Sequence, residues 1–452
     1  MTQLAGSRTQ RRIQPFIVLA IIVLAILVYA APLLADRLAV HEWGTFTALQ
    51  DENGRAIGGI NSDDEPVPRF VHRVADGLVG GQHWGGKGLA PGCHPDVTLR
   101  LETPVVYFYP PPGTEKLTLD CEVKFHGGWL TEYYPHACAI APGIGPGRKF
   151  GPLRSTTTGS LAWKKLEVGT AGKVRPTASH VWNAPRQVAA ATVTARGGES
   201  EKYLFYRGVG HLDAPLRVQR TADKTLRIQS AFGKLPGNEI PKVEASWLVS
   251  ILPDGKTAFR VLEPFTADEE RTVVATVEAH FDDTQYSAEN LTRLRAAMHH
   301  ALVADGLFAD EASALLDTWE SSYFKSPGTR LFFLVPEAWT DRVLPLEISV
   351  PADITRVMIG RIELITPRER RLLREIATRP ASNPGSRASR QANGNRAEPP
   401  ADYKAYRKLG RFRNALLLDA ARQEGALDAF IANYKLHGYR TGEEGRLSRR
   451  SP

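Results

Sequence analysis

The segment from residue 117 to residue 126 shows the most regular alternation of hydrophobic and polar side chains in the chain. Its hydrophobic positions are Leu117, Leu119, Cys121, Val123 and Phe125. An alternation of period two over ten residues predicts a β-strand with one buried face and one exposed face. We therefore expect Cys121 to lie in the core and His126 to face solvent.

Further hydrophobic runs of strand length are separated by Gly, Pro and Asp-Gly turn signals such as Pro253-Asp254-Gly255. They are Val97–Tyr109, Val188–Thr194, Tyr203–Tyr206, Leu226–Phe232, Val243–Leu252, Val273–Phe281, Leu331–Val335 and Thr355–Ile365. Many short strands with turn signals between them favour a mainly β fold, with an antiparallel, sandwich-like body spanning residues 38–366.

Helical patterns occur in two places. The segments Ala288–Val303 and Glu311–Tyr323 predict a helical hairpin inserted in the body near residues 288–324. After the body, Thr366-Pro367-Arg368-Glu369 has the features of a capped helix start, which predicts a helix over 367–379. Residues 380–401 have the composition of a disordered linker, and a basic helical tail over 402–452 follows, with one amphipathic helix at about 403–436.

The N-terminus has the pattern of a membrane signal. Residues 13–35 are uncharged and mostly apolar, and Arg8, Arg11 and Arg12 precede them. A helix of about 20 such residues spans a bilayer, and the arginines are expected to stay cytoplasmic. We expect residues 1–12 in the cytoplasm, a single-pass anchor in the inner membrane, and the body in the periplasm or outside. A cleaved signal peptide is the open alternative.

The net charge of +8 is unevenly distributed along the chain. Residues 367–452 carry a net charge of +10 and residues 1–35 carry +3, so the body between them carries −5. An acidic body gives no indication of nucleic-acid binding, and we expect no nucleic-acid partner. The basic tail either contacts anionic lipid headgroups or is simply solvated. The sequence does not indicate the oligomeric state.

The three cysteines, Cys93, Cys121 and Cys138, allow at most one disulfide bond, and the sequence does not specify the pairing. Cys93-His94 and the segment from His136 to Cys138 offer ligands that zinc would accept, although neither has a recognised zinc spacing. Whether a metal binds is left open, and we expect no organic cofactor.

Six of the twelve histidines lie between residues 41 and 136, which makes this region the first place to look for a site. The earliest is in His41-Glu42-Trp43-Gly44-Thr45-Phe46. A histidine beside a carboxylate is a typical general base with its orienting group, and an indole next to the pair can line an apolar pocket. We take His41 and Glu42 as candidate catalytic residues and Trp43 as a substrate-binding residue. The alternative is a strand start with packed side chains.

Asp63, Asp64 and Glu65 form the second candidate element. Adjacent carboxyl groups raise the pKa of one another, and a protonated carboxyl can act as a catalytic acid. A solvated acidic loop before Pro66 is the alternative interpretation.

The glycine-rich segment 77–92 is the third element. It resembles a phosphate-binding P-loop, but Gly88 stands where a Ser or Thr would hold magnesium, so we reject nucleotide binding. A loop that closes over a ligand would place His83, Trp84 and Lys87 at the substrate, together with the outward-facing His126. Simple disorder of this segment is the open alternative.

Three segments resemble exported bacterial proteins of unassigned function: His41–Phe46, Leu101–Tyr109, and Leu344–Leu346 followed by Val357–Glu363. The resemblance covers most of residues 40–366 and implies one continuous body. It implies no activity and assigns no catalytic residue.

These patterns lead to three hypotheses. The first is an acid–base enzyme acting on a membrane lipid or another envelope molecule, for example an isomerase of a polycyclic isoprenoid. The second is a non-catalytic envelope protein that binds a glycan, a lipid or a protein. The third is a metal-dependent hydrolase. A single pocket shared by His41, residues 63–65 and the glycine-rich segment would favour the enzyme, and their separation would favour the binding protein.

Overall fold

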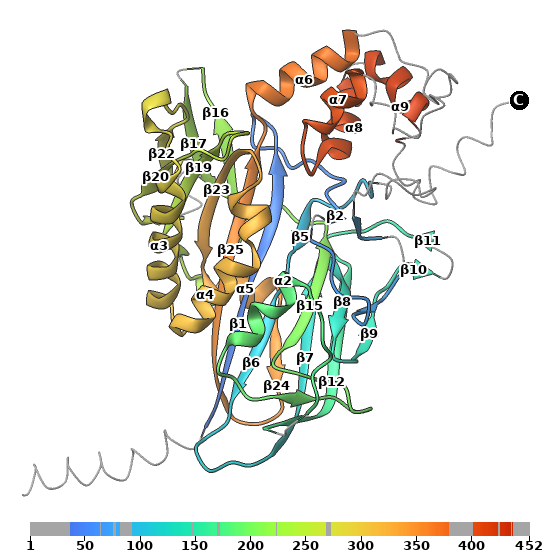
Figure 1. The fold of residues 1–452 in the computed structure, drawn as a ribbon, viewed down its shortest axis with the longest axis vertical. Helices are drawn as coiled ribbons and strands as arrows, with labels where there is room; N and C mark the ends of the chain where they lie inside the picture. The colour runs from blue at the N-terminus through green and yellow to red at the C-terminus, as the bar shows by residue number, and fades with distance from the viewer. Residues whose placement is uncertain are drawn as a thin grey trace, which may run out of the picture.

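The structure is a computed structural model that describes residues 37–63, 65–75, 78–81, 93–145, 149–169, 172–222, 224–267, 273–378, 401–423, 425–434 and 436. The fold is mainly β, as the sequence predicts, and its largest element is one mixed sheet of sixteen strands (Figure 1). Among the described residues, four smaller sheets and two groups of helices surround this sheet.

The main path of the sheet has eleven strands. In spatial order they are β14 (Ser200–Glu201), β13 (Val193–Thr194), β12 (Thr158–Val168), β8 (Gly128–Tyr134), β15 (Leu204–Gly210), β5 (Leu99–Leu101), β1 (Leu38–Gln50), β25 (Ala352–Leu364), β23 (Gly328–Val335), β19 (Ser246–Ile251) and β20 (Thr257–Leu262). Five more strands pair beside this path: β3 (His72–Arg73), β6 (Val105–Tyr109), β7 (Leu117–His126), β9 (Cys138–Ile140) and β24 (Leu346–Ile348).

The smaller sheets lie outside the main one. They are β16 (Leu216–Arg220) with β17 (Thr225–Ser230) and β22 (Ala275–Glu278), β2 (Ser62–Asp63) with β4 (Gly80–Gly81), β10 (Ile144–Gly145) with β11 (Lys149–Phe150), and β18 (Lys242–Val243) with β21 (Phe265–Thr266). The α-helices are α2 (His180–Asn183), α3 (Glu289–Ala304), α4 (Ala309–Thr318), α5 (Glu337–Val343), α6 (Pro367–Thr378), α7 (Ala401–Arg407), α8 (Arg413–Gln423) and α9 (Asp428–Tyr434).

The first and last long strands of the body lie side by side. β1 and β25 pair in parallel without a register shift, from Leu38 opposite Ala352 to Gln50 opposite Leu364. On its other side β1 pairs with β6 and β5. Three of the stretches that resemble exported bacterial proteins therefore lie side by side in the centre of the sheet, on β1, on its partner β25 and on its other partners β5 and β6. Gly44 is needed there because a Cβ atom would lie 2.9 Å from the Cα atom of Pro104.

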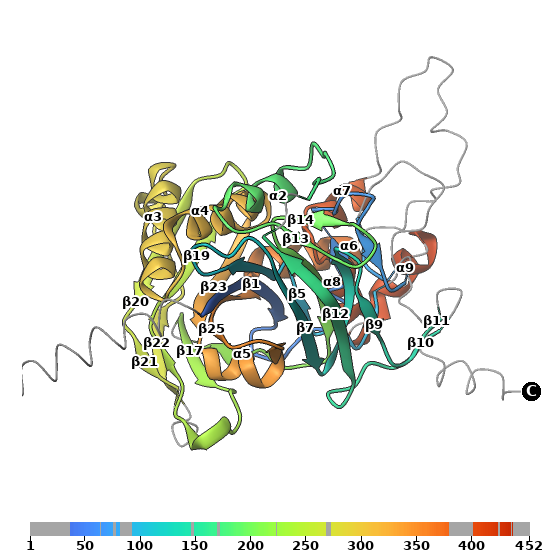
Figure 2. The same ribbon diagram turned by 90° about the horizontal axis from the view of Figure 1, so that it is seen from below.

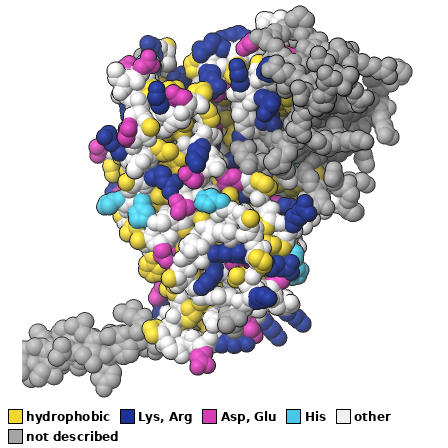
Figure 3. Space-filling view, viewed as in Figure 1, with side chains coloured by type: hydrophobic (Ala, Val, Ile, Leu, Met, Phe, Trp, Pro, Cys, Tyr) yellow, Lys and Arg dark blue, Asp and Glu magenta, His cyan; other side chains and the backbone are white. Residues whose placement is uncertain are grey.

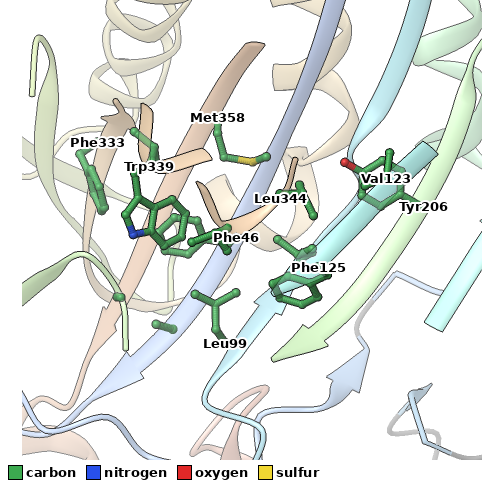
Figure 4. Packing of buried hydrophobic residues seen from close by; sticks show 14 of the residues in the cluster. Phe46, Leu99, Val123, Phe125, Tyr206, Phe333, Trp339, Leu344 and Met358 are labelled. Atoms are coloured by element: carbon green, nitrogen blue, oxygen red, sulfur yellow. The ribbon is translucent and has the colours of Figure 1, made fainter. Parts of the chain in front are cut away.

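The two faces of β1 contribute to different cores. Phe46 packs on one face against Trp339 of α5, with ring centroids 5.4 Å apart, and Met358, Phe333 and Leu344 join this cluster (Figure 4). Trp43 belongs to the core on the opposite face, which α3 and α4 cover. Viewed from below, the long strands curve around the side that carries α5, while α3 and α4 lie on the outside (Figure 2). On the face seen in Figure 3, acidic, basic and hydrophobic side chains are interspersed.

A third core joins the body to the C-terminal helices. Trp129 and Ile60 from the body share one buried cluster with Tyr406, Leu417 and Phe430. Ion pairs support this contact, since Arg55 donates to Asp419 at 3.0 Å and Arg411 donates to Glu102 at 2.6 Å. The described part of the basic tail is therefore packed on the body.

Several predicted elements are confirmed. β7 spans Leu117–His126, with Cys121 buried and His126 exposed. The inserted hairpin is present as α3 and α4, and α4 continues into a π-helix over Glu320–Phe324. The helix predicted over 367–379 is α6, whose described part ends at Thr378. The predicted linker at 380–401 lies outside the described residues except for its last residue.

Two predictions need correction. The single tail helix at 403–436 is wrong, because Gly410 adopts a positive φ of 83° between α7 and α8 and a short 3₁₀ helix over Gly425–Leu427 precedes α9. The single N-terminal membrane span is also not supported. Within the described residues no helix is both long and apolar enough to cross a bilayer, and residues 13–35, where the anchor is predicted, lie outside them. The transmembrane and signal-anchor assignment is therefore withdrawn.

A buried ion pair holds β1 and β25 together near their N-terminal ends. The Arg356 Nε atom donates to the Glu42 carboxylate at 2.7 Å, and the Tyr206 hydroxyl donates to the same carboxylate. Arg356 also donates to Asp341 at 2.7 Å and to the Leu344 carbonyl at 2.6 Å. Burial lowers the pKa of the Arg356 guanidinium, but Glu42, Tyr206 and Asp341 together outweigh this effect and the pKa is raised.

Replacing Arg356 is expected to destabilise the body strongly. Arg356→Met leaves the Glu42 carboxylate buried without its cation, which costs about 3–5 kcal/mol of unfolding free energy. The matched control is Arg37→Met, which removes the exposed pair with Asp353 at the same end of the strands and should cost less than about 1 kcal/mol. Urea unfolding at pH 7 compares the two, and equal losses would contradict a structural role for the buried pair.

Candidate functional site

His41 and Glu42 do not form the pair that the sequence suggests. Consecutive residues of a strand point to opposite faces, so adjacent side chains on β1 cannot contact each other across the sheet. Glu42 faces the core that contains Phe46, where Arg356 and Tyr206 bind it. His41 faces the helices α3 and α4. The physical reason for the correction is the strand itself, which separates the base from its predicted orienting group.

The carboxylate that holds His41 comes from α4. The Nδ1 atom of His41 lies 2.8 Å from Oε2 of Glu311, and both residues are almost fully buried. The Tyr109 hydroxyl donates to Oε1 of Glu311 at 2.7 Å, and the backbone N–H of Phe308 donates to Oε2 at 2.8 Å. The carboxylate of Glu311 only accepts hydrogen bonds, so Nδ1 of His41 must be the donor, like the Tyr109 hydroxyl and the Phe308 N–H. We therefore assign the proton to Nδ1 and the lone pair to Nε2.

Aromatic rings enclose this histidine. The His41 ring lies 4.6 Å from the Phe308 ring and 5.2 Å from the Tyr109 ring, measured between centroids. Burial and the neighbouring Glu311 carboxylate raise the pKa of the Tyr109 hydroxyl, which therefore stays protonated as a donor. Nε2 of His41 has no hydrogen-bond partner within the described parts of the chain. The His41 side chain is 8% exposed to solvent.

Local helix chemistry positions Glu311. Phe308 is the N-cap residue of α4, and Glu311 at the third helical position accepts the N-cap backbone N–H, as in half of a capping box. Asp310 and Glu311 also place negative charge in the first turn, where the helix dipole favours it. The sequence signal for Glu311 was thus available as a helix start, but nothing in it indicated a contact with His41, 270 positions away.

A cavity of about 260 Å³, which we call the edge cavity, lies where β23 ends, and His41 is not among the residues that line it. β23 ends at Val335 opposite Met358, so residues 354–356 of β25 have no β23 partner there, and these residues line the cavity. Thr355, the register partner of His41, is one of them. The turn between α3 and α4 closes the cavity, because a Cβ atom on Gly306 would lie 2.9 Å from Cγ2 of Thr355.

The edge cavity is lined by carboxyl groups. Asp305, Glu337 and Glu244 contribute to it, together with Lys242 and Arg356. Burial and then Glu244 raise the pKa of Asp305, and burial and then Asp341 raise the pKa of Glu337. The side chains of Asp305 and Glu337 are both exposed to solvent. The solvent screens their charges, so their interactions with neighbouring carboxyl groups contribute little free energy.

Glu65 lies in a separate buried network of arginines and glutamates. Its Oε1 atom accepts the backbone N–H of Ser322, in the π-helix, at 2.9 Å, and its carbonyl accepts from Arg207 at 3.1 Å. Its pKa is raised, first by burial and secondarily by Glu102, while Arg207 opposes the increase. A raised pKa fits the predicted acid, but it arises from burial and from Glu102 rather than from the sequence neighbours of Glu65.

The segment Glu102-Thr103-Pro104 belongs to the same network. Thr103 has a φ of 120°, which a β-branched residue rarely adopts, and its hydroxyl accepts from Nε of Arg207 at 3.3 Å. Glu102 is buried between Arg100 and Arg411. The contacts of this segment therefore hold it in a strained conformation.

The predicted site residues that the structure describes are not assembled into one pocket. His41 and Thr45 are four residues apart on β1, which is about 13 Å, and the Glu65 network reaches the strand at the Thr45 end. Trp43 is fully buried between these two positions, and His126 is exposed on β7 with Thr158 as its contact. Asp64, His83, Trp84 and Lys87 lie outside the described residues, as does the side chain of Asp63.

The cysteines form no disulfide bond in the structure, since Cys93 and Cys121 are buried thiols and Cys138 is exposed. Burial raises the pKa of the Cys93 thiol to about 12. Across the described ranges no group of three or more His, Cys, Asp or Glu side chains has the arrangement of a metal site.

Comparisons with known proteins add no function. No protein-family model matches the sequence, and no curated protein matches it. Among solved structures, the Fcho1 Mu homology domain of Danio rerio with bound Eps15 peptide aligns with 7% identity over 73% of this chain and 95% of that chain. Its TM-score is 0.26, which supports no argument about this protein.

Removing the Glu311 carboxylate is expected to destabilise the protein. In Glu311→Ala, the Tyr109 hydroxyl, the Phe308 N–H and the His41 Nδ1 atom lose their shared acceptor in a buried position, at a cost of about 3–5 kcal/mol. Glu289→Ala, in the first turn of the neighbouring helix α3, is the matched control and should change the unfolding free energy little, because Glu289 is exposed. Chemical unfolding of both variants measures the loss of unfolding free energy. An equal loss in Glu311→Ala and Glu289→Ala would show that the cluster around Glu311 does not stabilise the protein.

Glu65 predicts a specific pH dependence of stability. Its pKa is higher in the folded state than in the unfolded chain, so wild-type stability falls as pH rises from about 4 through the folded-state pKa. A pKa difference of 1 between the two states corresponds to about 1.4 kcal/mol at full ionisation. Glu65→Gln removes this ionisation, so its stability relative to wild type should increase between about pH 4.5 and about pH 8.

Urea unfolding of wild type and Glu65→Gln at both pH values measures this difference. The exposed Glu115→Gln is the control and should show no such change. A stability difference between wild type and Glu65→Gln that is the same at the two pH values would contradict the expectation.

Proposed function

We propose that the protein is an acid–base enzyme in which His41 acts as the general base. The observation that supports this proposal is the hydrogen bonding of the two imidazole nitrogens of His41. Nδ1 is held by a buried carboxylate at 2.8 Å, and Nε2 has no partner in the described part of the chain. A histidine oriented in this way through one nitrogen presents the other nitrogen to a substrate in the tautomer that accepts a proton.

The neighbours of His41 have distinct roles in this proposal. Glu311 fixes the tautomer and stabilises the imidazolium that forms when Nε2 takes a proton. Tyr109 and the Phe308 N–H hold both oxygens of Glu311 in place. The Phe308 ring, which is 48% exposed, packs against the histidine ring. Glu311, Tyr109 and Phe308 are positioning residues, and His41 is the member of this cluster that is proposed to touch the substrate.

The proton donor in this proposal is Asp305. It lines the edge cavity and belongs to the same turn as Phe308, whose ring packs against the proposed base His41. Its raised pKa keeps the carboxyl protonated to higher pH than an ordinary aspartate, which suits a general acid. This role replaces the one predicted for Glu65, which lies in another cluster.

The lining of the edge cavity supports a polar substrate. Carboxyl groups, a lysine and an unpaired strand edge offer acceptors and donors to hydroxyl, amide or amino groups. A polycyclic isoprenoid offers few such groups, so we favour a polar envelope molecule. A non-catalytic binding function is the second candidate, and the observation that favours it is the separation of His41 from Glu65.

Turnover should depend on His41. The protein is incubated in D₂O with a panel of amino sugars, N-acetylated sugars and sugar acids, and product formation or deuterium incorporation is followed by mass spectrometry. For a molecule that is turned over, His41→Gln should lower kcat by about 10²–10⁴-fold. Exposed His300→Gln on α3 should leave kcat unchanged.

The alternatives give different results. Equal kcat for wild type and His41→Gln would overturn the role of His41. Saturable binding of a panel member without any turnover or exchange would favour the binding function instead.

A further inference from the structure

A second cavity lies between the sheet and the C-terminal helices. It has a volume of about 100 Å³ and is bordered by the ends of β23 and β25, the start of α6 and the turn between α7 and α8 (Figure 1). We call it the arginine cavity, because Arg330, Arg361 and Arg411 line it, together with Glu363, Glu369 and Ser326. It is separate from the proposed catalytic site, since Arg361 is opposite Thr47, six residues and about 20 Å along β1 from His41.

Two of these arginines share one carboxylate. Arg361 donates to Glu363 at 2.5 Å, and the Nε atom of Arg330 lies 3.1 Å from the same oxygen. The remaining nitrogens of Arg330 donate to the carbonyls of Tyr323 and Ser326 at 2.8 Å. Nη1 of Arg361 is different: it is fully buried, and within the described residues it has no hydrogen-bond partner.

Arg411, which lines the cavity, shares a second carboxylate with Arg100, which does not line it. Arg411 donates to Glu102 at 2.6 Å, and Arg100 lies 3.5 Å from the same carboxylate. Four buried guanidinium groups are thus arranged around two shared carboxylates, Glu102 and Glu363. Glu65 and Glu369 are the other carboxyl groups nearby, and burial raises the pKa of both, which favours their neutral forms.

Such an arrangement is best completed by an anion. A buried cation without a full set of partners is costly, and the guanidinium plane matches the oxygens of phosphate with two parallel hydrogen bonds. The cavity, with a volume of about 100 Å³, has room for a small group such as one phosphate. Glu369 also lines the cavity, and its Oε2 atom accepts the Thr366 N–H at 2.9 Å.

We propose that the arginine cavity binds a phosphate group, with Arg361 as the principal ligand and Arg330 and Arg411 beside it. The group is either free phosphate or the phosphate of a small ester. The site joins β25 and β23 to the C-terminal helices, so an occupied cavity also stabilises their contact. Phosphate binding here does not depend on the proposed catalysis at His41.

Isothermal titration calorimetry of the full chain at constant ionic strength tests the site with three probes: inorganic phosphate, glycerol 3-phosphate and acetate. We expect saturable binding of phosphate and at least tenfold weaker binding to Arg361→Gln. Arg374→Gln on the exposed face of α6 is the matched control and should bind as wild type does. Tighter binding of glycerol 3-phosphate than of phosphate would identify an ester as the ligand, and the reverse would identify free phosphate.

Hydrogen–deuterium exchange of the wild-type protein is the second measurement, because it is informative even if Arg361→Gln does not fold. Phosphate should slow exchange at residues 326–330 and 409–412 and leave residues 305–308 unchanged. No saturable phosphate binding, equal binding by Arg361→Gln, equal binding of acetate, or no protection at these segments would each overturn the proposal.

Discussion

The parallel pairing of β1 with β25 is the interaction on which the rest of the structure depends. It joins thirteen consecutive residues at the start of the body to thirteen at its end, without a register shift. Because partners in a parallel pair share a face, the register also brings side chains together: Glu42 meets Arg356, His41 lies beside Thr355, and Thr47 lies beside Arg361. A slip of one residue would turn every one of these side chains to the opposite face.

Both polar clusters follow from this one strand pair. Alternate positions of β1 point toward α3 and α4, and along that face the chain places His41, then Trp43, then the threonines near the arginine network. The fully buried Trp43 separates a histidine–carboxylate cluster at one end from a guanidinium–carboxylate network at the other. The strand thereby allows two sites of different chemistry within one sheet, each closed by helices from a different part of the chain.

The fold class could be predicted from the sequence because the signals for it are local. The alternation over β7 and the helical pattern of α3 and α4 each occur within a window of about ten to sixteen residues. The site could not be predicted in the same way, because Glu311 and Arg356 are far from their partners in the chain. Reading His41 and Glu42 as a pair treated neighbours in sequence as neighbours in space, which the alternation of a strand forbids.

The C-terminal helices show the same limit. Their positive charge indicated a separate tail, but charge at the surface and packing beneath it are independent properties of a helix. Tyr406, Leu417 and Phe430 bury their side chains in the core that the body completes, and Arg411 pairs with Glu102 inside it. The shared core between the C-terminal helices and the body is visible only in the three-dimensional structure.

The pairing of β1 with β25 also has a consequence for synthesis on the ribosome. β1 is among the first parts of the body to be made, yet one of its edges has no partner until residues 352–364 have been translated. At about 5–20 residues per second, that edge stays open for tens of seconds, and an open hydrophobic strand edge is prone to pair with other chains. In the nascent chain, β1 is therefore a segment that a chaperone would need to cover. The His41 cluster can form only when translation of the body is nearly complete.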